Sequence, residues 1–301
     1  MKHNSDDDTK ILTLLRSEDK ANIKLAFQLC KGLAGKYNEE IAKELRFHLF
    51  LCLENDLERT HFENLEELVL EFDEIDKIPP QIAKLTHLKS LEIFEVMLND
   101  VPSEIGQLQH LKRLSLDTTN LATFPVAVCN LPRLETLKMT DNHLTKLPEV
   151  ISELSRLTHL ELGWNQLKNI PVSVGLLHKL VHLNLIKNQL GELPVEIGAL
   201  NQLASLIIGH NKLTTLPIEI GQLQNLRVLN ADHNQLKTLP ASIGQLESLY
   251  TLELKNNLIE SLPSEIQQLH SLKTLHLEGN ALSDEEKTNI SQWLPNCKIV
   301  F

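Results

Sequence analysis

The chain has 301 residues, of which 42% are hydrophobic and only 4% aromatic, so its interior must be built from aliphatic side chains. Leucine supplies about one residue in five, about twice its ordinary share, which excludes a disordered chain and is typical of repeat proteins. The 29 Lys and Arg against 40 Asp and Glu give a net charge of −11, which repels phosphate groups and excludes non-specific binding to nucleic acid or anionic membranes.

The chain begins with a polar, acidic stretch. Its first residues, MKHNSDDDTK, do not resemble a secretory signal, and no later window has the apolar length of a membrane span. The cysteines are scattered without a CxxC pair, and we interpret them as reduced, buried, small hydrophobic residues: Cys30, Cys52, Cys129 and Cys297. These features predict a cytoplasmic protein with no membrane partner.

Residues 1–53 carry helical patterns. We expect a short helix around 9–15, followed by helices over about 18–34 and 39–53 with Ser17 and Asn38 as their N-caps. Ile23, Phe27 and Cys30 recur at helical spacing and form an apolar face. We interpret residues 1–53 as a helical cap over the open end of the region that follows, with an independent docking module as the alternative.

The next stretch is strongly acidic. Residues 54–77 hold ten acids against Arg59 and Lys77, so this stretch alone carries −8 of the net charge. Leu65, Leu68 and Leu70 within it have the spacing of a short strand with one buried face. We therefore predict one degenerate unit of the repeat here.

A repeat of constant length follows. Prolines recur at intervals of 23 residues without an insertion or deletion, at 79, 102, 125, 148, 171, 194, 217, 240 and 263. The shared pattern is L-P-x-x-I-G-x-L-x-x-L-x-x-L-x-L-x-x-N-x-L, nearly intact in residues 193–215. A fixed period of this length indicates a stack of structural units, each adding one supersecondary element.

This pattern resembles leucine-rich repeats, and its L-P-x-x-I-G-x-L opening is similar to the 23-residue intracellular class of Ras-group and bacterial proteins. The resemblance covers about residues 54–282, as one degenerate unit plus nine regular repeats. It implies an α/β solenoid, an arc with a parallel concave β-sheet. It also implies a scaffold of intracellular signalling, although the family is defined by its fold rather than by one activity.

The physics of the unit leads to the same architecture. The L-x-x-L-x-L segment predicts a short strand with one buried face, and stacked units would give ten parallel strands. The P-x-x-I-G-x-L segment is too short for a full helix and predicts short helical or extended turns on the convex side. The asparagine seventeen residues after most prolines predicts a ladder that satisfies backbone groups at the turn, from Asn142 to Asn280.

The ladder weakens toward the N-terminal side. Its positions there hold Asp73, Val96 and Thr119, and valine cannot make the side-chain hydrogen bonds of the ladder. We therefore expect an irregular turn around residues 95–98.

Residues 283–301 predict a C-terminal cap made of a helix and a strand. Ser283 and Glu286 have the spacing of a capping box. The helix that they open places apolar side chains on one face, and the last residues alternate as a final strand; the residues concerned are Ile290, Trp293, Leu294, Cys297, Ile299 and Phe301.

The repeat register identifies the concave surface, because strand residues that are not part of the leucine pattern point away from the core. Around Trp164 it combines aromatic, apolar and polar residues on adjacent strands, which is typical of a recognition surface. We predict that a protein partner binds there, at His159, Trp164, His182, Ile186, Lys187, Ile207, His210, Asp232 and His233. The alternative is a carbohydrate or small-ligand receptor that uses Trp164 as a stacking platform.

The acidic stretch predicts a second patch on the same face, formed by Glu67, Glu71, Phe72, Glu92, Phe94 and Glu95. One interpretation is a binding site for a basic segment of the partner. The other is a solvated edge that keeps the end of the sheet soluble.

No pattern indicates catalysis or a cofactor. Residues 32–37 hold Gly32, Gly35 and Lys36, but the glycine spacing differs from a phosphate loop and Tyr37 replaces Ser or Thr, so a helix C-cap explains them better. The histidine pairs on the concave face predict pH-sensitive recognition groups rather than a metal cage, because a sheet splays its side chains. We expect a monomeric, non-enzymatic protein without a metal.

Overall fold

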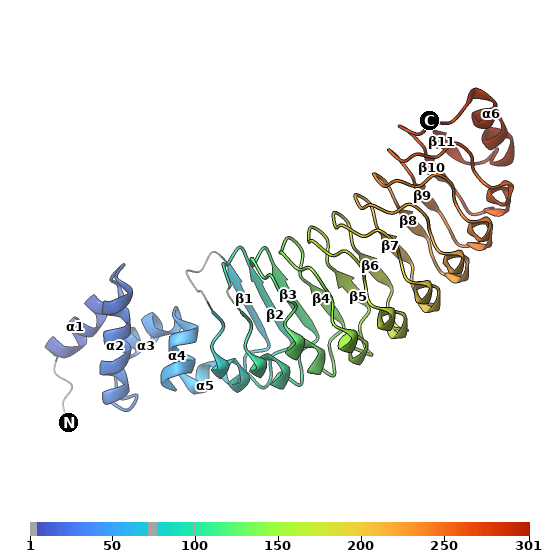
Figure 1. The fold of residues 1–301 in the computed structure, drawn as a ribbon. Helices are drawn as coiled ribbons and strands as arrows, with labels where there is room; N and C mark the ends of the chain where they lie inside the picture. Colours follow the sequence, from blue (N-terminus) through green and yellow to red (C-terminus); the bar gives the residue numbers. More distant parts are fainter. Residues whose placement is uncertain (1–4, 72–76, 99) are drawn as a thin grey trace.

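The computed structural model describes residues 5–71, 77–98 and 100–301. Helices at the N-terminus lead into a curved stack of strands and short turns, and a single helix with a final strand closes the other end (Figure 1). The strands line the inner, concave side of the arc, and 3₁₀ helices line the outer side. The predicted leucine-rich repeat solenoid is therefore confirmed.

All strands belong to one open parallel sheet in chain order, which is the simplest consequence of stacking identical units. Each leucine of a strand pairs with the leucine 23 residues later, as Leu160 does with Leu183. The strands are β1 (Glu67–Glu71), β2 (Ser90–Phe94), β3 (Arg113–Asp117), β4 (Thr136–Lys138), β5 (His159–Glu161), β6 (His182–Asn184), β7 (Ser205–Ile207), β8 (Val228–Asn230), β9 (Thr251–Glu253), β10 (Thr274–His276) and β11 (Lys298–Val300).

The convex side is built from 3₁₀ helices that begin directly after the repeated prolines. Proline has a fixed φ and no N–H, so it suits the position before a helix, where no donor is required. The isoleucine or valine of each turn points into the core, as Ile197 does. These helices are η1 (Pro80–Lys84), η2 (Ser103–Gln107), η3 (Val126–Asn130), η4 (Glu149–Glu153), η5 (Val172–Leu176), η6 (Val195–Ala199), η7 (Ile218–Gln222), η8 (Ala241–Gln245) and η9 (Ser264–Gln268).

The asparagine ladder is present as predicted and ties each repeat to its neighbour. Asn211 Nδ2 donates to the carbonyl oxygens of Leu185 (3.0 Å), Ile208 (3.0 Å) and Gly209 (3.2 Å). Its Oδ1 accepts from the backbone N–H of Leu190 at 3.0 Å. The buried amide therefore satisfies backbone groups that the turn would otherwise leave unpaired.

The irregular turn at Val96 is also confirmed. Val96 is buried, with 1% of its surface exposed, so an apolar contact replaces the ladder bonds there. The N–H of Leu98 instead donates to the carbonyl oxygens of Val96 and Thr119, both at 3.0 Å. Asp73 lies outside the described residues.

The C-terminal cap consists of α6 (Asp284–Trp293) and β11, as predicted. Ser283 accepts from the N–H of Glu286 at 3.1 Å, but Glu286 Oε1 accepts from Leu262 N–H at 2.9 Å, so only half of the capping box forms. This bond anchors the helix on the last repeat. Cys297 packs against the core but is only partly buried, so the prediction that it is buried was wrong. Phe301 follows β11 and is 40% exposed, so the predicted strand ends one residue earlier.

The N-terminal cap differs from the prediction in two places. Asp19, not Ser17, is the N-cap of the second helix, because its side chain accepts from Ala21 N–H at 2.8 Å. The helix expected over 39–53 breaks at Phe47 and His48. The helices are α1 (Ser5–Leu15), α2 (Lys20–Gly32), α3 (Glu39–Arg46), α4 (Leu49–Asn55) and α5 (Arg59–Phe62).

The break lets two short helices contact different neighbours. Helix α3 packs against α1, whereas α4 packs against α2 and against η1 of the first repeat. One straight helix could not reach both. Among the described residues, no helix is long and apolar enough to cross a membrane.

Candidate binding surface on the concave face

One column of the concave face has a left-handed backbone in every repeat from Glu95 to Gly279. Its residues stand directly before the ladder position, and their φ values lie between +52° and +74°. For side chains other than glycine this conformation costs about 1–2 kcal/mol, although Asn, Asp and His tolerate it better than bulky residues do. Trp164 and Lys187 therefore adopt a backbone conformation that glycine would adopt at lower energy.

Trp164 and Lys187 contact one another across two adjacent repeats. The indole of Trp164 is half exposed (50%), as its register predicts. Lys187 Nζ lies 3.2 Å from the centroid of the indole ring, and such a cation–π contact contributes about 0.5–1 kcal/mol at an exposed site. This contact orders two long side chains before any partner arrives, which lowers the entropy cost of binding.

The register predicts that Ile186 and Ile207 are exposed beside this pair, and the structure shows both only partly exposed. Ile186 leans over Gly163, where an added Cβ would come within 2.8 Å of the Ile186 Cγ2 atom. Gly209 leaves similar room for Asn230. The small residues thus allow apolar side chains to lie flat and form a shallow floor next to the indole.

The histidines form two pairs, as the register predicts. The rings of His159 and His182 have centroids 6.0 Å apart, and those of His210 and His233 stack at 3.9 Å with planes 12° apart. Asn256 Nδ2 lies 3.0 Å from His233 Nε2, so the row extends to Asn256, the next residue of the same column.

Burial is the main reason why two of these histidines favour the neutral form. It lowers the pKa of His182, and the charge of His159 lowers it further while Glu161 opposes the shift. Burial also lowers the pKa of His210, with smaller contributions from His233 and Lys187. In both cases the charge of the neighbouring histidine is a lesser effect than burial.

Asp232 has a structural partner. Its Oδ1 accepts from the backbone N–H of Lys255 at 2.6 Å, and burial raises the pKa of the carboxyl group. Asp117 makes the same bond to Thr140 N–H at 2.7 Å. We therefore assign Asp232 a structural role, because its carboxylate is already hydrogen-bonded to the backbone of the next repeat.

The acidic patch is partly neutralised by neighbouring cations. Glu67 pairs with Arg113 at 3.5 Å, and Lys89 pairs with Glu66 at 2.6 Å. Glu71 and Glu95 are exposed, whereas Glu92 and Phe94 are partly buried on β2. Phe72 lies outside the described residues. The described part of the patch forms a row of carboxylates on β1 and β2, next to Arg113 of β3.

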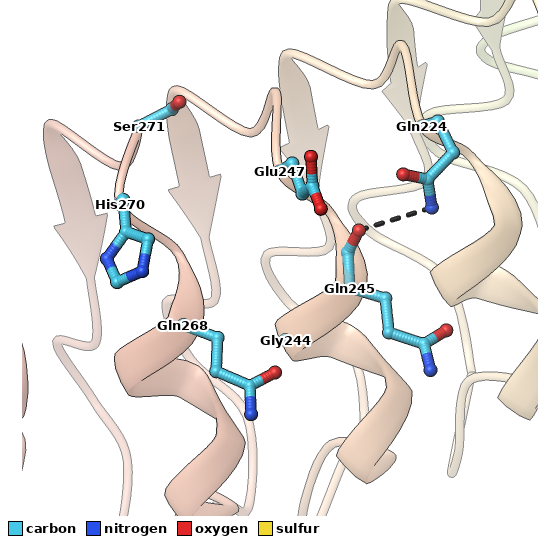
Figure 2. A pocket seen from close by; sticks show the side chains of 7 residues that line it. All are labelled: Gln224, Gly244, Gln245, Glu247, Gln268, His270 and Ser271. Atoms are coloured by element: carbon cyan, nitrogen blue, oxygen red, sulfur yellow. Dashed lines mark hydrogen bonds between the residues drawn. The ribbon is translucent and has the colours of Figure 1, made fainter.

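A hollow of about 700 Å³ lies away from the concave face, where the 3₁₀ helices of the last repeats turn into their strands (Figure 2). It is lined by Gln224, Gly244, Gln245, Glu247, Gln268, His270 and Ser271. Gln224 Nε2 donates to the carbonyl oxygen of Gln245 at 3.2 Å. The repeat pattern did not predict this surface, although its glutamines recur at one register position, as Gln245 and Gln268 do.

The concave face presents an aromatic side chain, a lysine and paired histidines. In the described part of the chain, no group of His, Cys, Asp or Glu is arranged to hold a metal ion. The cysteines are free, and burial raises the pKa of Cys30 and Cys129 to about 11 and that of Cys52 to about 12. Such thiols are poor nucleophiles at neutral pH.

Comparison with known proteins agrees with this architecture. The family profile described as "Leucine-rich repeat region" matches residues 47–163 and 219–292. A leucine-rich repeat protein of Leptospira interrogans is 34% identical, with a TM-score of 0.55, over 81% of this chain and 75% of its own. No protein of curated function matches the sequence.

Two further solved structures are similar. The Arabidopsis receptor kinase HAESA, in complex with the peptide hormone IDA and the co-receptor SERK1, is 26% identical with a TM-score of 0.63. The alignment covers 74% of this chain but only 39% of HAESA. An internalin of Listeria monocytogenes, at 22% identity and a TM-score of 0.57, covers 80% of this chain and 81% of its own and supports the fold alone.

The profile match and the Leptospira protein agree with the parallel sheet and the buried asparagine ladder. Members of this family are generally non-enzymatic binding scaffolds. The chain belongs to the leucine-rich repeat family.

Proposed function

We propose that this protein is a scaffold that binds a protein partner on its concave face, around Trp164. The observation that carries the proposal is the half-exposed indole, held on a left-handed backbone beneath Lys187. A bulky residue at such a position persists only where the surrounding structure holds it, and strained positions of this kind cluster at functional sites.

The neighbouring residues complete a surface of the composition found at interface hot spots. Trp164 supplies an aromatic anchor, Ile186 and Ile207 supply a partly exposed apolar floor, and Lys187 with the stacked His210 and His233 supplies polar contacts. Aromatic anchors with surrounding contacts that exclude water dominate the affinity of most interfaces. The peptide complex of HAESA supports the general use of this fold in polypeptide recognition.

Within this proposal the protein acts as a monomer in the cytoplasm, possesses no catalytic activity of its own and serves intracellular signalling. Its free cysteines, among them the buried Cys30, Cys52 and Cys129, fit a reducing compartment. The alternative of a sugar receptor gains no support from the geometry, because Lys187 Nζ already covers one face of the indole on which a sugar ring would stack.

The test is an affinity pull-down from cell extract with the double variant Trp164→Ala, Lys187→Ala. Loss of a central aromatic anchor costs at least about 2 kcal/mol of binding, a factor of about thirty. We expect the variant to lose the partners that the parent protein captures. Its free energy of unfolding should fall by no more than about 1 kcal/mol, the value of the lost cation–π contact at an exposed site.

The matched control is Thr118→Asn with Asp141→Asn, which alters the same left-handed column outside the patch with a residue type that tolerates this backbone. This control should keep both stability and partners. If the Trp164 variant melts normally and keeps every partner, the concave patch is not the binding site. If it unfolds early, the indole serves the fold instead.

A further inference from the structure

A row of cations lies on a different surface from the concave patch. Arg133, Arg156 and Lys179 occupy the same position in three successive repeats, in the turn that links each 3₁₀ helix to the following strand. We call these three residues the basic edge. Adjacent repeats are about 4.8 Å apart at their strands, so three positive charges stand in line on a protein whose net charge is −11.

The three cations of the basic edge form no ion pair among the described residues. All three side chains are exposed, and none makes a hydrogen bond or ion pair with any other described residue. Neighbouring cations do have partners, since Lys112 pairs with Glu135 at 3.3 Å and Lys138 pairs with Glu161 at 3.1 Å. Because like charges on adjacent repeats repel one another, an unpaired row of cations favours an external anion.

The hollow of Figure 2 continues the same edge toward the C-terminal cap. It lies near the equivalent turns of the later repeats, where Gln202, Asn225, Ser248 and Ser271 hold the position of the cations and Ser271 lines the hollow. Gln245 and Gln268, at the ends of η8 and η9, add amide side chains to its lining. Amides donate and accept hydrogen bonds, which suits the alternating N–H and C=O groups of a polypeptide backbone.

We propose that this edge binds an extended polypeptide segment that carries carboxylates at one end. The carboxylates would pair with the basic edge, and the backbone beyond them would lie in the amide-lined hollow. From Arg133 to Ser271 is six repeats, about 29 Å at the strand spacing, which an extended chain spans with about nine residues. The exposed Leu176 (58%), between Arg156 and Lys179 in the chain, offers one apolar contact.

A polypeptide fits this edge better than a nucleic acid does. Three cations neutralise few phosphates, and most of the affinity of a protein for nucleic acid comes from many such contacts. The negative charge of the whole molecule opposes a long polyanion but tolerates a short acidic segment.

The experiment measures fluorescence anisotropy of a labelled nonapeptide whose first half is glutamate and whose remainder is serine. The test variant is Arg133→Glu with Arg156→Glu. The control is Lys146→Glu with Lys168→Glu, an equal change of charge on exposed lysines that lie outside this turn position. We expect the test variant to weaken binding by about tenfold or more and the control to weaken it less than about twofold.

Further arms identify the occupant. A peptide with glutamine in place of glutamate should bind weakly, and Gln245→Ala with Gln268→Ala should weaken the acidic peptide about threefold. Equal losses in the test and control variants would overturn the proposal, since they would report only the net charge. So would the absence of peptide binding by the parent protein, or tighter binding of a single-stranded oligonucleotide than of the acidic peptide.

Discussion

At the residue scale, the left-handed backbone at Trp164 lets the stability effect of a side chain be measured apart from its effect on binding. Trp164 has φ of +56°, and Lys187 Nζ lies over its indole ring. Glycine adopts this backbone without strain, whereas a β-branched residue is disfavoured there. Two substitutions that both remove the indole should therefore have different effects on folding.

We predict that Trp164→Gly leaves the free energy of unfolding within about 0.5 kcal/mol of the parent, because relief of strain offsets the lost cation–π contact and the added freedom of the unfolded chain. Trp164→Val should destabilise the protein by about 1–2 kcal/mol more than Trp164→Gly does. Urea unfolding monitored by circular dichroism measures both values. Equal stabilities of the two variants would show that the backbone at Trp164 is not strained.

The histidines predict a pH dependence of stability. Because the folded protein lowers the pKa values of His182 and His210 below their ordinary value near 6.5, the unfolded chain binds more protons just below that pH. Stability contributed by these groups is therefore complete above about pH 7 and falls as the pH drops through 6.5.

The variant His182→Asn with His210→Asn removes both groups and keeps a residue type that tolerates the left-handed backbone at His210. Its melting temperature should fall less than that of the parent between about pH 7.5 and pH 5. Thermal scans at the two pH values give this difference. An equal fall in both proteins would assign the pH dependence to other groups.

At the scale of elements, the stability of the fold comes from the interfaces between neighbouring repeats. The two terminal repeats must be covered for the protein to remain monomeric. Leu275 and Leu277 of the last repeat are buried, with 0% and 1% exposed. Strand β11 covers β10, and Glu286 binds the backbone of Leu262. Without such a cap the final strand would present an unpaired edge and apolar side chains to water.

Deletion of residues 283–301 should therefore cause aggregation or loss of cooperative unfolding, which size-exclusion chromatography with light scattering and thermal melting would detect. The point variant Glu286→Ala should remain monomeric and lose only about 1–2 kcal/mol, the value of one hydrogen bond to a charged group. A truncated protein that stays monomeric with unchanged melting would show that the cap is dispensable.

At the scale of the whole molecule, charge is distributed unevenly. Glu71 and Glu95 lie at the N-terminal end of the concave face, whereas the basic edge lies on the turns of the middle repeats. Exposed charges act over about 10 Å at ordinary ionic strength, so the two surfaces can select partners of opposite charge. The acidic patch would add a basic segment to the preference of the concave face.

We predict that partner association on the concave face weakens as salt rises from about 0.05 M to about 0.5 M. The variant Glu67→Gln with Glu71→Gln should lower the affinity at low salt and flatten the salt dependence. Surface plasmon resonance with the partner isolated in the pull-down measures both effects. Affinity that is independent of salt in the parent protein would remove the acidic patch from the binding surface.

The sequence alone determined the number of strands, their register and the ladder of asparagines. These features follow from a strict 23-residue period, because every repeat contacts the equivalent residues of its neighbours and no long-range pairing has to be found. The same period placed Trp164 on the concave face and paired His210 with His233. Local energetics and sequence-adjacent contacts are enough for such conclusions.

Only the tertiary structure decided how side chains share that surface. The position of Lys187 over Trp164, the half-burial of Ile186 and the bond from Asp232 to Lys255 N–H depend on rotamers and on backbone direction between repeats, which no residue pattern encodes. The break between α3 and α4 also depends on tertiary structure. Helix α3 packs against α1 and α4 packs against α2 and η1, and these contacts outweigh the continuous helical pattern of the sequence. The repeat period specifies which residues are neighbours, whereas packing and hydrogen bonding specify the contacts and the burial of their side chains.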